Sequence, residues 1–346
     1  MNPSAMRFRR VLVLTGDHSL ADPTKWEGCY TPEDIALHDA MKEALLGLPG
    51  YEFSFLTRHD RLIETLRDQR PDFVLNLCDT GLGNIAAREL HVPALLEVLG
   101  IPYSGAPPAC MVLCYDKAIV RLVAAEMGIP VPREIAIHPE RDLETIQAFY
   151  PSLIKPARGD GSVGIRPDAV VRGPAQARDY LAWFRKELPG RIALMQEYLP
   201  GAEYGLALVG NPGTGLTAFP PLEVDYSGLP RELSPILAFE SKTAPDTPYS
   251  QVAIRQAHLP AGTVEELRRR SAILFERLEC RDYARFDFRT GEDGEIKLLE
   301  VNPNPAWSRE AKLARMARFA GHDYPDLLRM ILEAARSRIQ ASGEVS

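Results

Sequence analysis

Residues 284–302, ARFDFRTGEDGEIKLLEVN, predict an antiparallel β-hairpin, and a hairpin restricts which side chains can face one another. Two strand-like runs are separated here by a Gly-Glu-Asp-Gly turn signal. Side chains at positions i and i+2 of a strand point to the same face. Arg285 and Asp287 therefore share a face, as do Glu300 and Asn302, and the turn brings the second pair beside the first.

This arrangement predicts a cluster of oxygen ligands formed by Asp287, Glu300 and Asn302. Carboxylate and amide oxygens are the hard ligands that Mg²⁺ prefers, and Mg²⁺ usually completes its shell with water and phosphate oxygens. The cluster therefore predicts a Mg²⁺ site that works with a nucleotide. The same spacing also fits a polar sheet end in which the acids pair with Arg285 and Lys297.

The N-terminal third of the chain alternates apolar strand-like runs with helical patterns. Residues 11–15, 51–57 and 72–78 are the strand candidates, and a Thr31-Pro32 helix start precedes a helical pattern. Such alternation is typical of a parallel sheet covered by helices. We predict an α/β domain over residues 1–112.

The rest of the chain predicts α+β structure. Residues 113–194 form one unit, with a helix near 141–149, and residues 195–346 form a second unit that contains the hairpin. Residues 225–251 are rich in Pro and Ser and are too long for a simple connector. Segments of this kind inside a compact domain are often lids.

Composition limits the classes of function. A chain with 45% hydrophobic and 25% charged residues is typical of a globular protein, and a net charge of −7 argues against a nucleic-acid binder. No apolar stretch approaches the ~20 residues that a membrane span needs. Five scattered cysteines, an odd number, fit a reducing cytoplasm. We expect a cytoplasmic protein without nucleic-acid or membrane partners.

Two of the cysteines, Cys110 and Cys114, could share one face of a helix. Neither has a further Cys or His at metal-ligand spacing nearby in the sequence. A zinc site is therefore not expected.

Two further segments are candidates for nucleotide contacts. In PSLIKPARGDGSVGI, residues 151–165, Lys155 leaves a strand and is followed by glycines whose backbone N–H groups could turn toward phosphate. Lys117, at a helix start, is a second candidate cation. In LMQEYLPGAE a strand ends in a Pro-Gly turn before Glu203, which could accept ribose hydroxyls. Each of these patterns alone also fits a common Gly-rich turn, a surface lysine or a solvated loop.

Taken in order, the segments resemble the ATP-grasp superfamily, and within it the D-alanine–D-alanine ligase-like branch. The segments that carry the resemblance are YDK (115–117), IKPARGDGSVGI (154–165), MQEYLPGAE (195–203), ESK (240–242), ARFDF (284–288) and LLEVNPNP (298–305). The resemblance covers roughly residues 70 to 335, and the motifs are specific as a set.

The resemblance implies a fold of mixed α/β and α+β class: an N-terminal α/β (pre-ATP-grasp) domain followed by a two-subdomain ATP-grasp fold. It also implies an ATP-dependent carboxylate–amine ligase that forms an acyl phosphate, releases ADP and leaves an amide between small acids or amino acids. One or two Mg²⁺, for which Mn²⁺ can substitute, would assist. Dimers are usual in the family, so a homodimer is implied by analogy.

The resemblance also assigns roles to residues. The catalytic set is Arg285, Lys242 and Ser162. The nucleotide-binding set is Lys117, Lys155, Gly161, Ser162, Gln196, Glu197, Leu199, Glu203 and Lys242. The metal ligands are Asp287, Glu300 and Asn302. The substrate-binding set is Arg88, Glu89, Arg285, Ala306 and Lys312.

Two departures from the family pattern bear on the substrate. Arg88, with Glu89 beside it, replaces a family glutamate that recognises an ammonium group, and a guanidinium there inverts the charge preference. Lys312 stands near the position of a family serine that holds the second substrate's carboxylate, and it fits equally a replacement by charge or a solvated helix lysine. From the Arg88 departure we do not expect D-alanine as the first substrate and favour an acid that presents a second carboxylate or another acceptor group, although a true D-alanine–D-alanine ligase stays open.

Two other classes of protein are alternatives. A non-catalytic ATP-binding sensor or partner subunit would have no need of the oxyanion arginine, Arg285. A nicotinamide dehydrogenase would carry a G-x-G-x-x-G turn after residues 11–15, and the sequence there lacks it.

Overall fold

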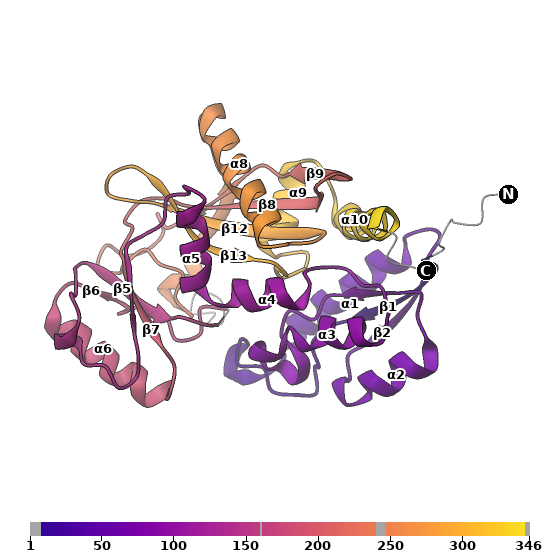
Figure 1. Cartoon of the computed structure of the whole chain (residues 1–346), viewed down its shortest axis with the longest axis horizontal. Coiled ribbons are helices and arrows are strands. Elements are labelled where there is room, and N and C mark those ends of the chain that lie inside the picture. The colour runs from indigo at the N-terminus through magenta and orange to yellow at the C-terminus, as the bar shows by residue number, and fades with distance from the viewer. Residues whose placement is uncertain (1–7, 160, 240–246, 343–346) are drawn as a thin grey trace.

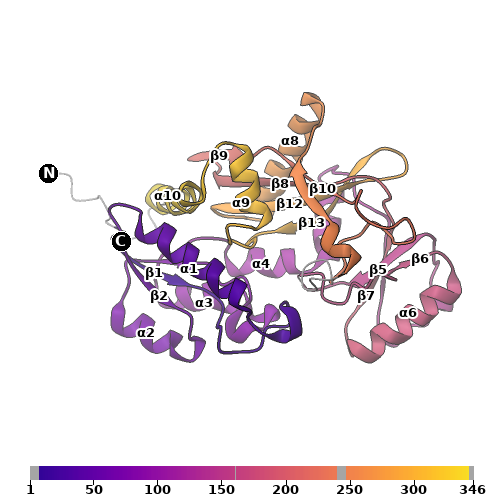
Figure 2. The same cartoon turned by 180° about the vertical axis from the view of Figure 1, so that it is seen from behind.

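The computed structural model describes residues 8–159, 161–239 and 247–342. Its strands form three sheets, each with its own helices, and Figures 1 and 2 show the three resulting units from opposite sides. Among the described residues, no helix combines the length and apolar character needed to cross a bilayer.

The N-terminal unit holds a parallel sheet in the order β2-β1-β3, which confirms the predicted α/β pattern. Four buried residues of β1 place this strand in the centre of the unit. Thr31 caps the first long helix by accepting from the backbone N–H of Asp34, as the sequence predicts. The elements are β1 (Arg10–Leu14), α1 (Pro32–Leu46), β2 (Glu52–Leu56), α2 (Leu62–Gln69), β3 (Phe73–Asn76) and α3 (His91–Val98).

The second unit holds an antiparallel sheet in the order β4-β7-β5-β6, with α6 packed against it. Strand β7 belongs wholly to this sheet, which therefore extends past residue 194. The elements are β4 (Glu134–Ile137), β5 (Ser152–Pro156), β6 (Val170–Val171), α6 (Pro174–Glu187) and β7 (Ala193–Glu197).

The helix expected near 141–149 is wrong. The structure has only a 3₁₀ turn there, Leu143–Thr145, and the chain then runs irregularly to Pro151. Leu143 is buried, and Ile146 and Phe149 also pack against the core of the second unit. Proline disfavours helical backbone at the residue before it, and these apolar contacts stabilise the irregular path.

The third unit holds a six-stranded antiparallel sheet in the order β11-β10-β8-β12-β13, with β9 also paired to β8. Helices α4, α5 and α8 cover one face, and α9 and α10 cover the face that meets the N-terminal unit. The strands are β8 (Glu203–Asn211), β9 (Gly215–Ala218), β10 (Leu222–Asp225), β11 (Ala253–Gln256), β12 (Tyr283–Thr290) and β13 (Ile296–Asn302). The helices are α4 (Pro108–Tyr115), α5 (Lys117–Glu126), α8 (Ala261–Arg277), α9 (Lys312–Phe319) and α10 (Tyr324–Ser342).

The predicted hairpin is confirmed by β12 and β13. In the register of these two strands, Asp287 lies opposite Glu300, and Arg285 lies opposite Asn302. The four side chains therefore come together at one end of the sheet, as their spacing predicts.

The described part of residues 225–251 has little regular structure beyond the 3₁₀ turn Pro248–Gln251. Ile236, Ala238 and Tyr249 are nevertheless buried in the core of the second unit. The segment therefore packs against this unit, and whether it moves as a lid stays a prediction.

Candidate active site

A pocket of about 410 Å³ lies where the three units meet. It has the size of a small-molecule site. One wall comes from loops of the N-terminal unit, a second from β5, β7 and the Gly-rich loop, and a third from the ends of β12 and β13. Among the described residues, every predicted site residue except Arg88 lines it. Lys242 lies outside the described residues.

The end of the hairpin supplies three oxygen donors. Asp287 is buried, and both of its oxygens accept from the Arg285 guanidinium, at 2.8 and 3.0 Å. The Asn302 amide lies 3.4 Å from Asp287, and Glu300 lies 3.4 Å from the Lys117 ammonium. Two carboxylates and an amide, converging on a pocket also lined by lysines, form a donor set that fits a hard divalent cation with phosphate.

The alternative of a simple polar sheet end is supported only in part. Arg285 does pair with Asp287, as that alternative predicts. Lys297, however, pairs with Glu197 at 2.9 Å and Asp293 at 3.2 Å, away from the oxygen cluster. Glu300 therefore has a pocket lysine, Lys117, as its neighbouring cation rather than Lys297.

Two buried lysines bring positive charge to the pocket. Lys155 lies near the end of β5 and is only 4% exposed, and this burial lowers the pKa of its ammonium group. Lys117 is placed by the Asp116 carboxylate, which caps α5 by accepting from two backbone N–H groups. The Lys117 ammonium also donates to the Gly159 carbonyl. Buried cations are stabilised by opposite charge, so a polyanion such as triphosphate fits beside them.

The Gly-rich loop approaches the N-terminal unit closely. Gly159, Gly161 and Ser162 all have positive φ, of 132°, 66° and 62°. A Cβ on Gly161 would lie 3.3 Å from a side-chain carbon of Thr24, so glycine allows both the backbone conformation and the approach. The loop therefore covers one side of the pocket.

The residues predicted for the adenosine site also line the pocket, and several have partners. Gln196 donates to Glu134 at 2.7 Å, and Glu197 binds Lys297. Glu203 is buried, accepts from Tyr226 at 2.6 Å and lies 3.3 Å from Arg289. Leu199 lies beside them as an apolar wall residue.

The structure corrects the placement of Arg88. This side chain is exposed at the end of the 3₁₀ turn Ala86–Arg88 and does not line the pocket, whereas Glu89 does. The Asn304 amide donates to Glu89 at 2.8 Å, and Tyr283 donates to the Asn304 oxygen. This chain of hydrogen bonds positions the carboxylate of Glu89 at the pocket, so the charge inversion attributed to Arg88 is absent there.

Two other predicted substrate residues, Ala306 and Lys312, also line the pocket, and their binding role stays a prediction. Ala306 is exposed to the pocket, and Lys312 lines it with its ammonium 3.7 Å from Glu203 and 4.0 Å from Asp287. Lys312 is thus part of the charged network around the oxygen cluster.

Pocket residues of the N-terminal unit that sequence reasoning missed include Lys25, Tyr30, Asp79 and Thr80. Asp79 and Thr80 follow the carboxyl end of β3, where ligands bind in parallel sheets, so a signal for them was present. Burial raises the pKa of Asp79 to about 6. Lys25, 2.7 Å from Asp34, comes from an irregular loop that carries no comparable signal.

Comparisons with known proteins identify the family. The family model described as "D-ala D-ala ligase C-terminus" matches residues 123–333, which is more than half of the chain. The chain belongs to this family. The ligase therefore has the ATP-grasp fold and the ADP-forming carbon–nitrogen chemistry of its family, which uses ATP and a divalent metal.

Individual relatives agree with this assignment. An "Uncharacterized protein y4sG" of Sinorhizobium fredii is 31% identical over 261 residues, 74% of the ligase and 73% of that protein. A D-alanine–D-alanine ligase of Dechloromonas aromatica is 27% identical over 305 residues, 87% of both chains. The structure of a D-alanine–D-alanine ligase from Bacillus anthracis superposes with a TM-score of 0.72, at 23% identity, over 97% of the ligase and 99% of that chain.

Proposed function

We propose that this ligase activates the carboxylate of a small amino acid and joins it to the amine of a second small molecule. One observation carries the proposal: carboxylates and cations line opposite walls of the pocket. Asp79 and Glu89 lie on the N-terminal wall, together with Lys25. Lys117, Lys155 and Arg285 lie on the other wall, beside the oxygen cluster of the hairpin. An amino acid offers an ammonium group to the first wall and a carboxylate to the second.

In this proposal the nucleotide phosphates bind Lys117, Lys155 and the Gly161-Ser162 backbone, with Lys242 joining them from the segment after residue 239. Asp287, Glu300 and Asn302 would hold one or two Mg²⁺, with Mn²⁺ as a substitute, and the metal would neutralise phosphate charge. The adenosine would lie against the residues of β7 and the following turn. Those residues are Gln196, Glu197, Leu199 and Glu203.

The reaction has two steps. The carboxylate oxygen of the first substrate attacks the γ-phosphorus of ATP, and the bond to the ADP oxygen breaks, which leaves an acyl phosphate. The amine nitrogen of the second substrate then attacks the acyl carbon and loses a proton, and inorganic phosphate leaves. Arg285 is suited to stabilise the oxyanion between these states, and its pairing with Asp287 holds it in place.

Exclusion of water follows from the same geometry. The Gly-rich loop lies against Thr24, and Ile236 and Leu237 line the pocket from the segment proposed as a lid. An acyl phosphate formed beneath them would be protected from hydrolysis.

The identity of the second substrate is the part of the function that the experiment below determines. Relatives are named for different second substrates: D-alanine in the Dechloromonas aromatica ligase, D-lactate in a putative ligase of Streptomyces coelicolor, and D-serine in an Enterococcus faecalis ligase. Because Glu89 rather than Arg88 faces the pocket, D-alanyl-D-alanine synthesis stays a candidate. By analogy with the family, we also propose that the protein is a homodimer and lies in the cytoplasm. Light scattering of the purified protein tests the dimer.

The experiment is a release assay for ADP and phosphate with ATP, Mg²⁺ and amino acids tested singly and in pairs, with Glu300→Ala as the blank. Release that depends on a pair, with a new amide mass, supports the proposal and identifies the substrates. Release with D-alanine alone identifies a D-alanine–D-alanine ligase. ATP binding without turnover across amino acids, hydroxy acids and amines would contradict a ligase and favour a sensor.

A further inference from the structure

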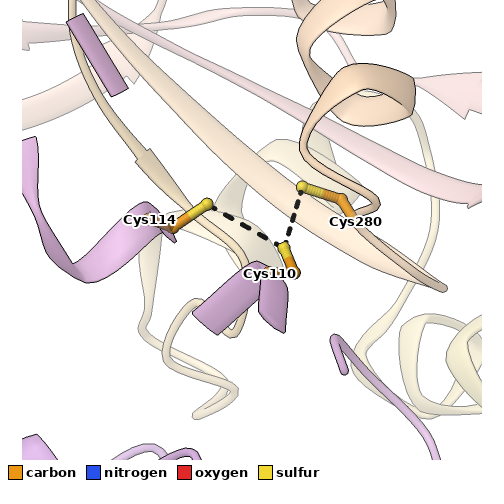
Figure 3. A group of neighbouring side chains, drawn as sticks. All are labelled: Cys110, Cys114 and Cys280. Atoms are coloured by element: carbon orange, nitrogen blue, oxygen red, sulfur yellow. Dashed lines mark hydrogen bonds between the residues drawn. The ribbon is translucent and has the colours of Figure 1, made fainter. Parts of the chain in front are cut away.

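Three buried cysteines from distant parts of the chain meet at one point beside the pocket (Figure 3). Cys110 and Cys114 lie one turn apart on α4, and Cys280 follows α8. The Cys110 sulfur is 3.9 Å from that of Cys114 and 3.7 Å from that of Cys280, and all three sulfurs lie within 4.8 Å of one another.

These distances fit metal coordination without a large movement of the chain. A metal–sulfur bond of about 2.3 Å places two thiolates of a tetrahedral or trigonal site about 3.8 to 4.0 Å apart. Two of the three sulfur separations already lie close to that range. A buried cysteine by itself is most often a small apolar side chain, but three sulfurs directed at one another form a ligand set.

The cluster also has a route for entry. Cys114 lines the active-site pocket, whereas Cys110 and Cys280 are buried behind it in the core between α4 and the third sheet. A cysteine binds metal as the thiolate, so binding would release the thiol protons. No His, Asp or Glu in the described part of the chain joins the three sulfurs as a fourth ligand.

We propose that Cys110, Cys114 and Cys280 bind one thiophilic d¹⁰ metal ion, Cu⁺ or Zn²⁺. Thiolates select these ions over the hard cations that suit the oxygen cluster of the hairpin. Under this proposal the expectation that Cys110 and Cys114 form no metal site would be wrong, because the third cysteine, Cys280, is 170 residues from Cys110 in the sequence.

The position of the ion gives it a structural effect. It would join α4 to the end of α8, and α4 leads directly through Asp116 to Lys117 at the start of α5. Ion binding is therefore expected to raise the unfolding temperature of the whole chain, because three thiolates held together in the folded chain bind the ion more tightly than the separated thiols of the unfolded chain.

The test uses the full-length protein, reduced and freed of metal, and titrates it with Cu⁺ under anaerobic conditions or with Zn²⁺, each against a competing chelator. We expect one ion per chain by native mass spectrometry, a thiolate-to-metal absorption band, and a higher unfolding temperature. Cys280→Ser and Cys110→Ala should each weaken the affinity at least ~100-fold. Cys78→Ala, a buried cysteine of the N-terminal unit outside the cluster, is the matched control and should bind as the unaltered chain does.

Circular dichroism establishes that the variants fold, and having two of them keeps the test valid if one does not. Retained one-to-one binding in either folded variant would overturn the proposal, because the ion would then lie elsewhere. Absence of a bound ion with both metals would overturn it too. A third outcome would also overturn the proposal: the reduced protein binds no metal, and mild oxidation removes two free thiols and lowers the mass by two hydrogens. Two of the cysteines would then form a disulfide, and the cluster would be a redox pair.

Discussion

Asp287 and Glu300 lie opposite each other on the neighbouring antiparallel strands β12 and β13, and both side chains line the pocket. Directly opposed carboxylates repel each other, and cations reduce that repulsion. Here Arg285 binds Asp287, and Lys117 lies 3.4 Å from Glu300. The pair is therefore stable without a metal and retains the oxygens that a metal would bind.

Glu300→Gln should lower ligase turnover by on the order of 100-fold or more, because it removes a charged ligand proposed for the metal. The fold should remain, since glutamine occupies the same volume. Glu292→Gln, an exposed acid in the turn of the same hairpin, should leave turnover unchanged. Turnover is measured by ADP release at saturating ATP and Mg²⁺. Equal activity of the two variants would remove Glu300 from the metal site.

Glu89→Gln should raise the KM of the amino acid whose carboxylate is activated by roughly 10-fold or more, since it removes the charge that faces the ammonium group. Its hydrogen-bonding partner, Asn304, can still donate to the glutamine oxygen, so the pocket should keep its shape. Arg88→Gln is the matched control and should leave KM unchanged, because this side chain is exposed. If Arg88→Gln has the larger effect, the assignment of Glu89 is wrong.

Lys155→Met should weaken ATP binding by about 2 kcal/mol or more, which is roughly 30-fold, while the free enzyme keeps or gains stability. The gain arises because the buried ammonium is replaced by an apolar side chain of similar length, and burial of a charge is unfavourable. Glu300 would still have Lys117 beside it. Calorimetric ATP titration and urea unfolding measure the two effects.

Lys186→Met, on the exposed surface of α6, is the control for Lys155→Met and should change neither quantity. Unchanged ATP affinity in Lys155→Met would show that this lysine does not contact the nucleotide.

Local sequence patterns predicted the elements of the site better than its contacts. The hairpin follows from a period of two residues and a glycine turn, so the opposition of Asp287 and Glu300 could be predicted without a structure. The parallel N-terminal sheet follows in the same way from alternation of strands and helices. Each of these features depends on residues close together in the sequence.

The features that were missed depend on distant residues. The sequence predicted both Arg88 and Glu89 for the pocket, but only Glu89 lines it, where it accepts a hydrogen bond from Asn304, 215 residues away. Cys280 joins Cys110 across a comparable separation. Neither contact can be predicted from local residue spacing, because the periodicity of one segment does not determine which distant segment packs against it.

Asp79 gives the molecule a pH dependence whose sign can be worked out. Burial raises its pKa to about 6, above the usual 3.8, so the folded chain binds a proton that the unfolded chain releases between those two pH values. This contribution to stability is fully present below pH 3.8 and is lost as the pH rises through about 6. At pH 8, Asp79→Asn should therefore be more stable than the unaltered chain by up to about 3 kcal/mol.

Urea unfolding at a series of pH values measures this difference. The difference in unfolding free energy between Asp79→Asn and the unaltered chain should fall to a constant value below pH 4, because Asp79 is then protonated in both the folded and the unfolded state. Asp68→Asn, an exposed acid on α2, should show no such trend. A difference that grows as the pH falls would mean that Asp79 is stabilised as a carboxylate in the free enzyme, with Lys25 as the neighbouring cation. The side chain would then be ionised across the whole range in which an ammonium substrate binds, and ligase KM would not change between pH 5 and pH 8.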